Sequence, residues 1–352
     1  MYALQSGIEH RSQDSESSLI FHYHNYDRKY DNSGYLDEYY SESFVIKGEQ
    51  SVIVNDKISI GYGSEYKYDW GQFENRGSYT ASTKGHIKDL GVFVNAGYKI
   101  NENQILSIYG RSDDNNSTGT NETYKLNYTY IFNKLKLSGT HSTGLRNPSL
   151  YELYGSDNFG LGGNAFLKPE KSKTNELFGE YNFSEKLKFT STIYRATIFD
   201  RIESNYSVGK HQNFQTDLNQ KGIESKLFFK GNNDKMSLFT NFSKSRKVNG
   251  QAQARRPDLS FGANYTRKFV SNIYGPFNLN LNYKHTGQFI DYDGSKNSRQ
   301  KSTDLIDLSI NKNWFGNIIS INLTNLLNER YEKPATYSQD GRQIKFGFRK
   351  TY

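Results

Sequence analysis

Two histidines have the residue type and the spacing that come closest to those of a metal-binding site. His22 and His24 lie two positions apart, and the positions that alternate with them are apolar, as at Phe21. In an extended strand, both imidazoles therefore face the same side. Two imidazoles at this spacing could bind a metal ion. No third ligand is evident, so we interpret the pair as polar residues that line the inner side of a sheet.

The sequence lacks the motifs of other kinds of catalytic or cofactor site. The 352 residues include no cysteine, which excludes disulfides, thiolate zinc sites and cysteine nucleophiles. The sequence contains neither a Gly-x-Ser-x-Gly nucleophile turn nor a Gly-x-Gly-x-x-Gly phosphate loop. We therefore predict no catalytic residues, no enzymatic activity and no organic cofactor.

The composition narrows the class of protein. Only 34% of the residues are apolar, which is low for a large globular core, while 15% are aromatic, which argues against disorder. The formal net charge is +8, but lysine and arginine are spread along the chain among acidic residues. A nucleic-acid site would cluster them, so we expect no nucleic-acid partner. No run of about 20 apolar residues predicts a transmembrane helix.

The elements that must position any site are strands, because apolar residues recur at every second position rather than about every 3.6 positions, as they would in a helix. Each alternating stretch covers about ten residues, whereas the strands of a soluble sandwich usually have about five or six. We count about 18 candidate strands, of which the one near 3–10 is the least clear. The alternation is clearest at 58–68, 126–132, 259–265, 279–283, 306–310 and 319–323.

The connections between strands alternate in length. Tight turns are predicted at 101–103, at Asn133 and at 231–234. Short turns at one end of the strands and long loops at the other are typical of a transmembrane antiparallel β-barrel. We therefore predict an all-β barrel in an outer membrane. The long polar loops are expected at 27–35, 70–85, 113–120, 144–172, 245–256, 292–302 and 333–341.

Such a barrel explains the low apolar content, because only every second strand residue meets lipid. Lysine and arginine near the strand ends would contact anionic lipopolysaccharide. The face predicted to contact membrane lipid holds Ile58, Ile60, Tyr62, Leu279, Leu281, Ile319 and Ile321.

The last strand carries a further pattern. Ile344, Phe346 and Phe348 alternate, and the chain ends on the aromatic residue Tyr352. A terminal strand of this kind resembles the sorting signal that outer-membrane barrels present to the barrel-assembly machinery. We therefore expect that machinery to be a partner.

Three motifs, in order along the chain, resemble those of TonB-dependent outer-membrane receptors. The first is Thr143–Gly155 followed by Gly163–Ser172, with "Leu-Tyr-Gly" and then "Leu-Lys-Pro-Glu". The second is Arg255-Arg256-Pro257, which precedes an alternating strand. The third is Asn325–Tyr331 followed by Gly341-Arg342. Each is weak alone, but the resemblance covers most of the chain from about 23 to 352.

We interpret the motif residues as structural rather than ligand-binding. Pro148 and Pro169 lack a backbone donor and would lie where the chain leaves the sheet. Asn325 would fix the last short turn through side-chain-to-backbone hydrogen bonds. The resemblance also implies that Glu176 opens the strand after the Lys-Pro-Glu motif. The remaining members of the motifs are Leu167, Lys168, Glu170, Leu326 and Tyr352.

Among the branches of the family, the spacing of Tyr194-Arg195 and of Asp200-Arg201-Ile202 resembles that of cobalamin receptors. The resemblance implies uptake of a scarce nutrient across the outer membrane, with cobalamin as the expected substrate. A siderophore receptor and a plugless passive pore are the alternatives. The extracellular loops expected to bind the ligand are 27–35, 70–85 and 144–172.

A complete receptor of this family has a globular plug and 22 strands. We therefore expect residues 1–352 to be one barrel domain that is incomplete at its N-terminal side, with TonB contacted only through the missing plug. On this interpretation the chain alone should not support energised uptake.

The resemblance also suggests a structural calcium ion, since acidic extracellular loops bind calcium in cobalamin receptors. Carboxylate oxygens are suitable calcium ligands. The residues of the matching type are Asp27, Asp31, Asp37 and Glu38, although acidic loops are more often simply solvated.

Overall fold

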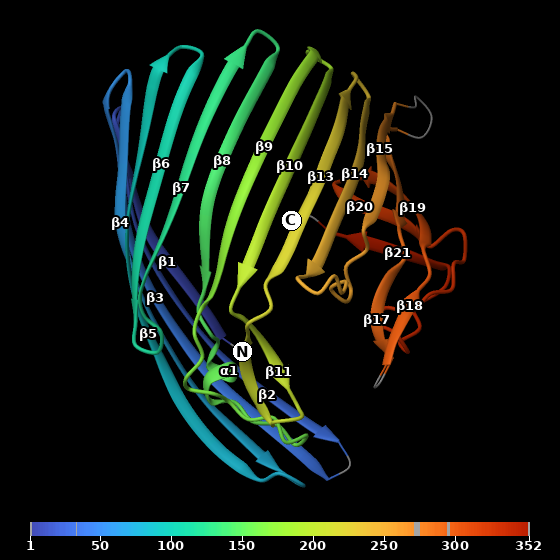
Figure 1. Cartoon of the computed structure of the whole chain (residues 1–352). Coiled ribbons are helices and arrows are strands. Elements are labelled where there is room, and N and C mark those ends of the chain that lie inside the picture. The colour runs from blue at the N-terminus through green and yellow to red at the C-terminus, as the bar shows by residue number, and fades with distance from the viewer. Residues whose placement is uncertain (1, 33, 271–274, 294–295, 351–352) are drawn as a thin grey trace. The chain divides into compact units, whose positions relative to one another are not determined.

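The computed structural model describes residues 2–32, 34–270, 275–293 and 296–350 (Figure 1). Over these ranges most of the chain is antiparallel β-strand, and its one helix, α1 (Leu150–Tyr154), has five residues. The predicted all-β class is confirmed. Seventeen strands belong to one large sheet, close to the 18 expected, and two further hairpins lie outside it.

The strands fall into two groups along the chain. Those before α1 are β1 (Tyr2–Arg11), β2 (Ser15–Asn32), β3 (Tyr35–Asn55), β4 (Ile58–Arg76), β5 (Ala81–Asn101), β6 (Gln104–Asn115), β7 (Gly119–Phe132) and β8 (Leu135–Arg146). Those after α1 are β9 (Glu170–Ser184), β10 (Leu187–Phe199), β11 (Arg201–Asn205), β12 (Lys210–Phe214), β13 (Leu218–Lys230), β14 (Asp234–Lys247), β15 (Leu259–Phe269), β16 (Phe277–Thr286), β17 (Phe289–Asp293), β18 (Lys296–Gln300), β19 (Thr303–Trp314), β20 (Asn317–Thr324) and β21 (Gln343–Arg349).

The chain divides into two compact units. Unit 1 comprises Met1–Tyr130, Gly139–Asn175 and Ala196–Asp217, and unit 2 comprises Ile131–Ser138, Glu176–Arg195 and Leu218–Tyr352. In unit 1, β1 to β7 pair as successive antiparallel hairpins. In unit 2, β13 to β16 do the same, and β16 then pairs with β19 across the inserted β17–β18 hairpin.

The strand register confirms the period of two. Leu281 lies opposite Tyr265 on one side and Leu308 on the other, so the three side chains share a face. Their neighbour Asn280 lies on the opposite face and accepts a hydrogen bond from Thr266 Oγ1 at 2.9 Å. One face is thus apolar across β15, β16 and β19, while contact of that face with lipid stays a prediction.

Strands β2 to β5 are far longer than predicted. They have 18 to 21 residues, and 21 residues extend about 70 Å, against an apolar band about 25 Å tall. The expected loops at 27–35 and 70–85 are therefore wrong over most of their length, because paired strands continue to 32 and to 76. Beyond the apolar band both faces of a strand can be polar, so composition there resembles that of a loop.

Two other expected loops are also wrong in part. The stretch 113–120 is strand except for 116–118, and 292–302 contains most of the β17–β18 hairpin. The stretches 144–172, 245–256 and 333–341 are largely loop, as predicted. The tight turns are confirmed, and Asn133 adopts a positive φ of 49° that suits an asparagine.

Apolar packing inside unit 1 supports α1. Ile87, Leu153, Leu167 and Ile202 form a buried cluster, against which Leu150 and Tyr154 pack. The helix contacts β4 and β5 and lies beside the β11–β12 hairpin in Figure 1. A small core thus holds the 147–169 segment against the long ends of these strands.

Within the described residues, no helix combines the length and the apolar character needed to cross a membrane.

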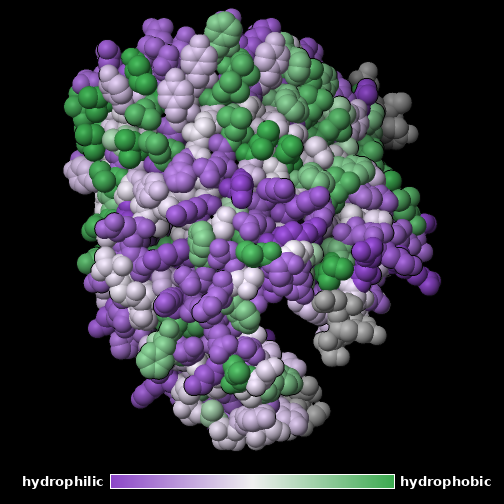
Figure 2. All heavy atoms as spheres, viewed as in Figure 1, coloured by the Kyte–Doolittle hydropathy of each residue, from purple (hydrophilic) through white to green (hydrophobic). Residues whose placement is uncertain are grey.

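Part of the exposed apolar surface lies near the ends of the strands. On the face shown in Figure 2, hydrophobic residues gather toward the upper ends of the strands, where the short turns lie, and hydrophilic residues dominate below. The exposed apolar residues near short turns include Phe132, Phe183, Phe229 and Leu238. The described part of the last strand ends at Arg349, so the expected signal at Tyr352 lies outside the described residues.

Candidate functional site

A cavity of about 1000 Å³ lies in unit 1 at the long-loop ends of the strands. One wall is formed by β2 and β3, mostly by one face of the pair, with Tyr40 and Glu42 added from the other face. Register places Tyr26 opposite Ser41, and Tyr30 opposite Asp37, so these four side chains point the same way. The other walls come from β4, β5, the 147–159 segment and the β11–β12 hairpin.

Aromatic rings dominate this cavity. Tyr39 packs against Phe73 and Tyr151 with ring centroids 5.8 and 5.7 Å apart, so the rings fix one another in place. Such a surface offers large, flat apolar contacts together with hydroxyl groups. The aromatic lining residues are Tyr26, Tyr30, Tyr39, Tyr40, Phe73, Tyr151, Phe159 and Tyr206.

The cavity is also net acidic, because five carboxylates line it against two cations. The Asp69 carboxylate accepts a hydrogen bond from Ser43 at 2.6 Å and forms an ion pair with Lys67 at 2.7 Å. The side chains concerned are Asp37, Glu42, Asp69, Asp89 and Asp157, against Arg28 and Lys67.

A buried polar network fixes part of the cavity wall. Asp37 is 5% exposed and accepts hydrogen bonds from the amides of Asn75 at 2.6 Å and Asn158 at 2.5 Å. Ser156 in turn donates to Asn75. The network joins β3, β4 and the segment after α1, so the carboxylate of Asp37 is held in a preformed position.

A capping box and an ion-pair cluster hold α1 in place. Ser149 caps the helix, with reciprocal bonds between Ser149 and Glu152. Arg146 bonds to Glu152 at 2.9 Å and to Glu170 at 2.8 Å. Burial opposes ionisation of Glu152, but the bonds from Arg146 and from Ser149 prevail and hold the pKa of Glu152 below its ordinary value.

The three segments predicted to bind ligand all reach this cavity. They contribute Tyr30 from 27–35, Phe73 from 70–85 and Tyr151 from 144–172. Ligand binding by them stays a prediction. Sequence reasoning missed Tyr206, because nothing local to the β11–β12 hairpin indicates that its turn reaches this cavity.

The four predicted calcium ligands do not lie together. Asp27, Asp31 and Glu38 share one face of the β2–β3 hairpin, whereas Asp37 points to the opposite face, toward the cavity. Glu38 lies 3.4 Å from Lys29 and 3.6 Å from Arg76. The set of four is therefore separated by the pleat. Calcium binding at this hairpin stays a prediction.

The two histidines share a face, as predicted, with ring centroids 5.4 Å apart, and His24 lines the cavity. The described residues hold no group of three or more His, Asp or Glu side chains that could bind a metal ion.

The Leu-Lys-Pro-Glu residues contact other parts of the chain. Leu167 and Pro169 are buried, and the exposed Lys168 donates its backbone N–H to Asn213 Oδ1 at 2.8 Å. Glu170 opens β9, so the expectation that Glu176 does so is wrong, and Glu176 is an exposed residue within that strand. Arg146 bonds to Glu170 at this first residue of the strand. Pro148 is fully buried and lines the cavity.

Asn325 makes the side-chain-to-backbone bonds that were predicted. Its amide donates to the carbonyls of Glu329 at 2.9 Å and Asp340 at 3.2 Å, and its oxygen accepts from the N–H of Glu329 at 2.8 Å. The connection is not a short turn, however, since 325–342 separates β20 from β21. The next residue, Leu326, donates its N–H to Ile306.

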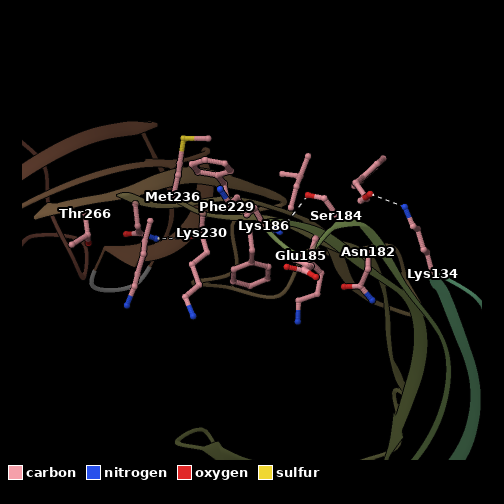
Figure 3. A pocket seen from close by; sticks show the side chains of 16 residues that line it. Lys134, Asn182, Ser184, Glu185, Lys186, Phe229, Lys230, Met236 and Thr266 are labelled. Carbon is pink, nitrogen blue, oxygen red and sulfur yellow. Dashed lines mark hydrogen bonds between the residues drawn. The ribbon is translucent and has the colours of Figure 1, made fainter. Parts of the chain in front are cut away.

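A second cavity, of about 1120 Å³, lies at the short-turn ends of strands in unit 2. Figure 3 shows its lining, which includes Lys134, Lys186 and Lys230 together with Phe229 and Met236. Lys134 Nζ donates to the carbonyl of Phe183 at 3.1 Å. This cavity lacks the buried carboxylate network of unit 1, so we regard the unit 1 cavity as the candidate ligand site.

Comparison with known proteins finds a match to one protein family. A sequence profile described as "TonB dependent receptor-like, beta-barrel" matches residues 2–326. Among curated proteins, the vitamin B12 transporter BtuB of Photobacterium profundum is 32% identical over 138 residues, covering 39% of this chain and 21% of that protein. BtuB of Vibrio cholerae is 24% identical over 239 residues, covering 66% of this chain and 38% of that protein. The chain thus spans well under half of these relatives.

Two solved structures share the fold. The siderophore receptor PirA from Acinetobacter baumannii has a TM-score of 0.83 at 15% identity, covering 99% of this chain and 62% of that chain. The ferripyoverdine receptor of Pseudomonas aeruginosa has a TM-score of 0.80 at 11% identity, covering 99% and 55%. At these identities the likeness shows the fold alone.

Proposed function

The chain belongs to the TonB-dependent receptor β-barrel family, and on that premise we propose that it is barrel sequence of an outer-membrane receptor for cobalamin uptake. Its role is then to bind and admit a scarce nutrient rather than to catalyse a reaction. The long-loop ends face the outside and the short turns face the periplasm.

The observation that carries this proposal is the aromatic, net acidic cavity of unit 1. Cobalamin is a large molecule with a broad apolar ring and many carboxamide groups. Tyrosine rings such as Tyr39 and Tyr151 suit contact with such a ring, and fixed carboxylates such as Asp37 and Asp69 suit carboxamide N–H donors. The similarity to proteins named vitamin B12 transporters points the same way.

A siderophore receptor is the second candidate, because the solved structures above carry that function in their names. Many ferric siderophore complexes are anionic. Five carboxylates against two cations in the cavity would repel such a ligand. The charge of the site therefore favours cobalamin.

The partners follow from this proposal. Membrane lipid would contact the apolar face of the strands, and lipopolysaccharide the basic residues near their outer ends. TonB would act through a plug segment, and the barrel-assembly machinery would insert the protein. A structural calcium ion at the β2–β3 hairpin remains part of the proposal.

Equilibrium binding tests the substrate. The purified 352-residue chain in detergent is titrated with cyanocobalamin and, separately, with a ferric catecholate siderophore. We expect saturable binding of cyanocobalamin only, weakened at least tenfold by Tyr26→Ala and by Tyr206→Ala. Tyr62→Ala is the matched control, since Tyr62 lies on the opposite face of β4 from the residues of that strand that line the cavity. Binding of the siderophore without cobalamin would reverse the assignment.

A further inference from the structure

A third cavity, of about 810 Å³, lies in unit 2 at the long-loop ends of its strands. It is bounded by β16, by the β17–β18 hairpin with the segment after it, and by the loops around 255 and 329–334. Six cations line it against three carboxylates, which are Asp291, Glu329 and Glu332. The cations are Arg255, Lys284, Arg299, Lys301, Arg330 and Lys333.

One of the three carboxylates, that of Asp291, is buried and makes all its contacts within the cavity wall. Asp291 is 0% exposed, and Arg255 Nε donates to its Oδ1 at 2.6 Å. The backbone N–H groups of Tyr292 and Ala335 also donate to it, each at 2.8 Å. Burial opposes ionisation of Asp291, but these bonds prevail and hold its pKa below its ordinary value. The Asp291 carboxylate therefore cannot neutralise the other cations.

The remaining five cations have no carboxylate partner within the part of the chain that the structure describes. Glu332 accepts the N–H of Thr336 through its Oε2 at 2.7 Å, and with three carboxylates against six cations the lining keeps a net positive charge. The five cations come from three separate elements and line one cavity, where their like charges repel one another. Such an arrangement is relieved by an anion that enters among them.

The walls of the cavity are held by hydrogen bonds that do not involve the free cations. Arg255 donates its N–H to the carbonyl of Ile290 at 2.7 Å, which joins the β14–β15 loop to β17. Asn325 holds the start of the following loop through Glu329. The cavity is therefore preformed, which lowers the entropic cost of binding.

The position of Lys284 indicates where the ligand comes from. Register places Lys284 opposite Leu305, whereas its neighbour Tyr283 lies opposite Ile306 on the face predicted to contact lipid. Lys284 therefore points away from the predicted lipid face. A lipid headgroup on the outer surface would not reach it, so a soluble ligand is favoured over lipopolysaccharide.

We propose that this cavity binds a small soluble anion that carries two or more phosphate or carboxylate groups. Arginine forks pair with such oxyanions through two hydrogen bonds, and lysines add point charges. This is a second ligand class, carried by residues other than those of the unit 1 cavity, and it does not depend on cobalamin being the nutrient.

Calorimetric titration of the full chain in a zwitterionic detergent tests the proposal, with pyrophosphate and citrate as probes. We expect one site per chain, and binding that weakens as sodium chloride rises from 0.05 to 0.5 M, because salt screens the charges. The double variant Lys284→Gln with Arg330→Gln should weaken binding at least tenfold. Thermal unfolding followed by circular dichroism shows whether this variant is folded, and the single variant Arg299→Gln, with an expected loss of at least threefold, provides the test if it is not.

The matched control removes the same charge elsewhere in unit 2. Lys188→Gln with Lys230→Gln alters the short-turn cavity (Figure 3) and should leave binding within twofold. An equal loss in both double variants would show a non-specific charge effect and would overturn the site. Absence of saturable binding of both probes, or binding of lipopolysaccharide micelles that pyrophosphate does not displace, would overturn it as well.

Discussion

Arg146 and Glu170 form a two-pronged ion pair across the longest loop of unit 1. Nε and Nη2 of Arg146 donate to the two carboxylate oxygens of Glu170 at 2.8 and 2.9 Å. Arg146 is the last residue of β8 and Glu170 is the first of β9, so the pair closes the ends of the segment that carries α1. The same guanidinium bonds to Glu152 in the helix.

The first prediction concerns this ion pair. Arg146→Lys keeps the charge but cannot make both bidentate contacts. We expect it to lower the local stability of the 147–169 segment by about 1 kcal/mol, since the arginine side chain is 45% exposed and solvent weakens its bonds. Hydrogen exchange of that segment measures the loss. Unchanged protection of Leu153 in the variant would show that the apolar cluster alone holds the helix.

The second prediction concerns Asn325, whose side chain makes three hydrogen bonds to the backbone in a buried position. Asn325→Ala should cost about 2–4 kcal/mol, at about 1 kcal/mol a bond plus the strain of a positive φ without asparagine. Denaturant unfolding in detergent measures the cost. Asn325→Gly separates the two contributions, since glycine removes the bonds but accepts the backbone angle.

Asn328 provides the comparison for that experiment. It also has a positive φ, of 56°, but its exposed side chain accepts a single hydrogen bond among the described residues, from the N–H of Arg342 at 3.0 Å. Asn328→Ala should therefore cost clearly less than Asn325→Ala. Equal costs would mean that backbone strain, and not the hydrogen bonds, accounts for the effect.

The third prediction tests which face of β16 meets lipid. Leu281→Arg should cost about 2–4 kcal/mol if Leu281 lies near the middle of the membrane. Asn280→Arg should cost only about 1 kcal/mol, the value of the lost hydrogen bond from Thr266, because Asn280 lies on the face predicted to be wet. Reversible unfolding from lipid vesicles measures both. Equal costs at the two neighbouring positions would contradict the assigned faces.

The sequence predicted the sheet well because strand pairing follows a local rule. The alternation at 279–283 and 319–323 predicts a strand and the division of its side chains between two faces, and the strand register agrees at each. The long ends of β2 to β5 were missed for a physical reason. Where both faces of a strand are wet, as around Lys29 and Glu38, the period of two disappears although the backbone pairing continues.

The site was only partly predictable. Helix α1 has a local signal, the Ser149-x-x-Glu152 capping box, which could have located it within the expected loop. The contact of Tyr39 with Tyr151 joins residues more than a hundred positions apart, and no local pattern encodes it. The same holds for the hairpin that brings Tyr206 to the cavity.

The fourth prediction concerns pH and His211, which lies in the β11–β12 hairpin with only 6% of its surface exposed. Burial lowers the pKa of His211, because the apolar surroundings disfavour the charged ring, and the nearby Glu152 and Asp157 only partly oppose this. The unfolded hairpin therefore takes up a proton at a higher pH than the folded one. The contribution of neutral His211 to the stability of the folded hairpin is fully present above a pH of about 6.5, the pKa of an unfolded histidine. It is lost as the pH falls toward the lower pKa of His211 in the folded hairpin.

We accordingly expect residues 201–214 to exchange amide hydrogens faster at pH 5 than at pH 7, after correction for the intrinsic rate. The ring of His211 packs 5.7 Å from that of Tyr151, which lines the unit 1 cavity, so ligand affinity should fall over the same range. His211→Gln should remove both effects. The β17–β18 hairpin contains no histidine and serves as the internal control. A pH dependence of 201–214 that survives in the glutamine variant would assign the effect to another group, with the carboxylates beside His211 as the next to test.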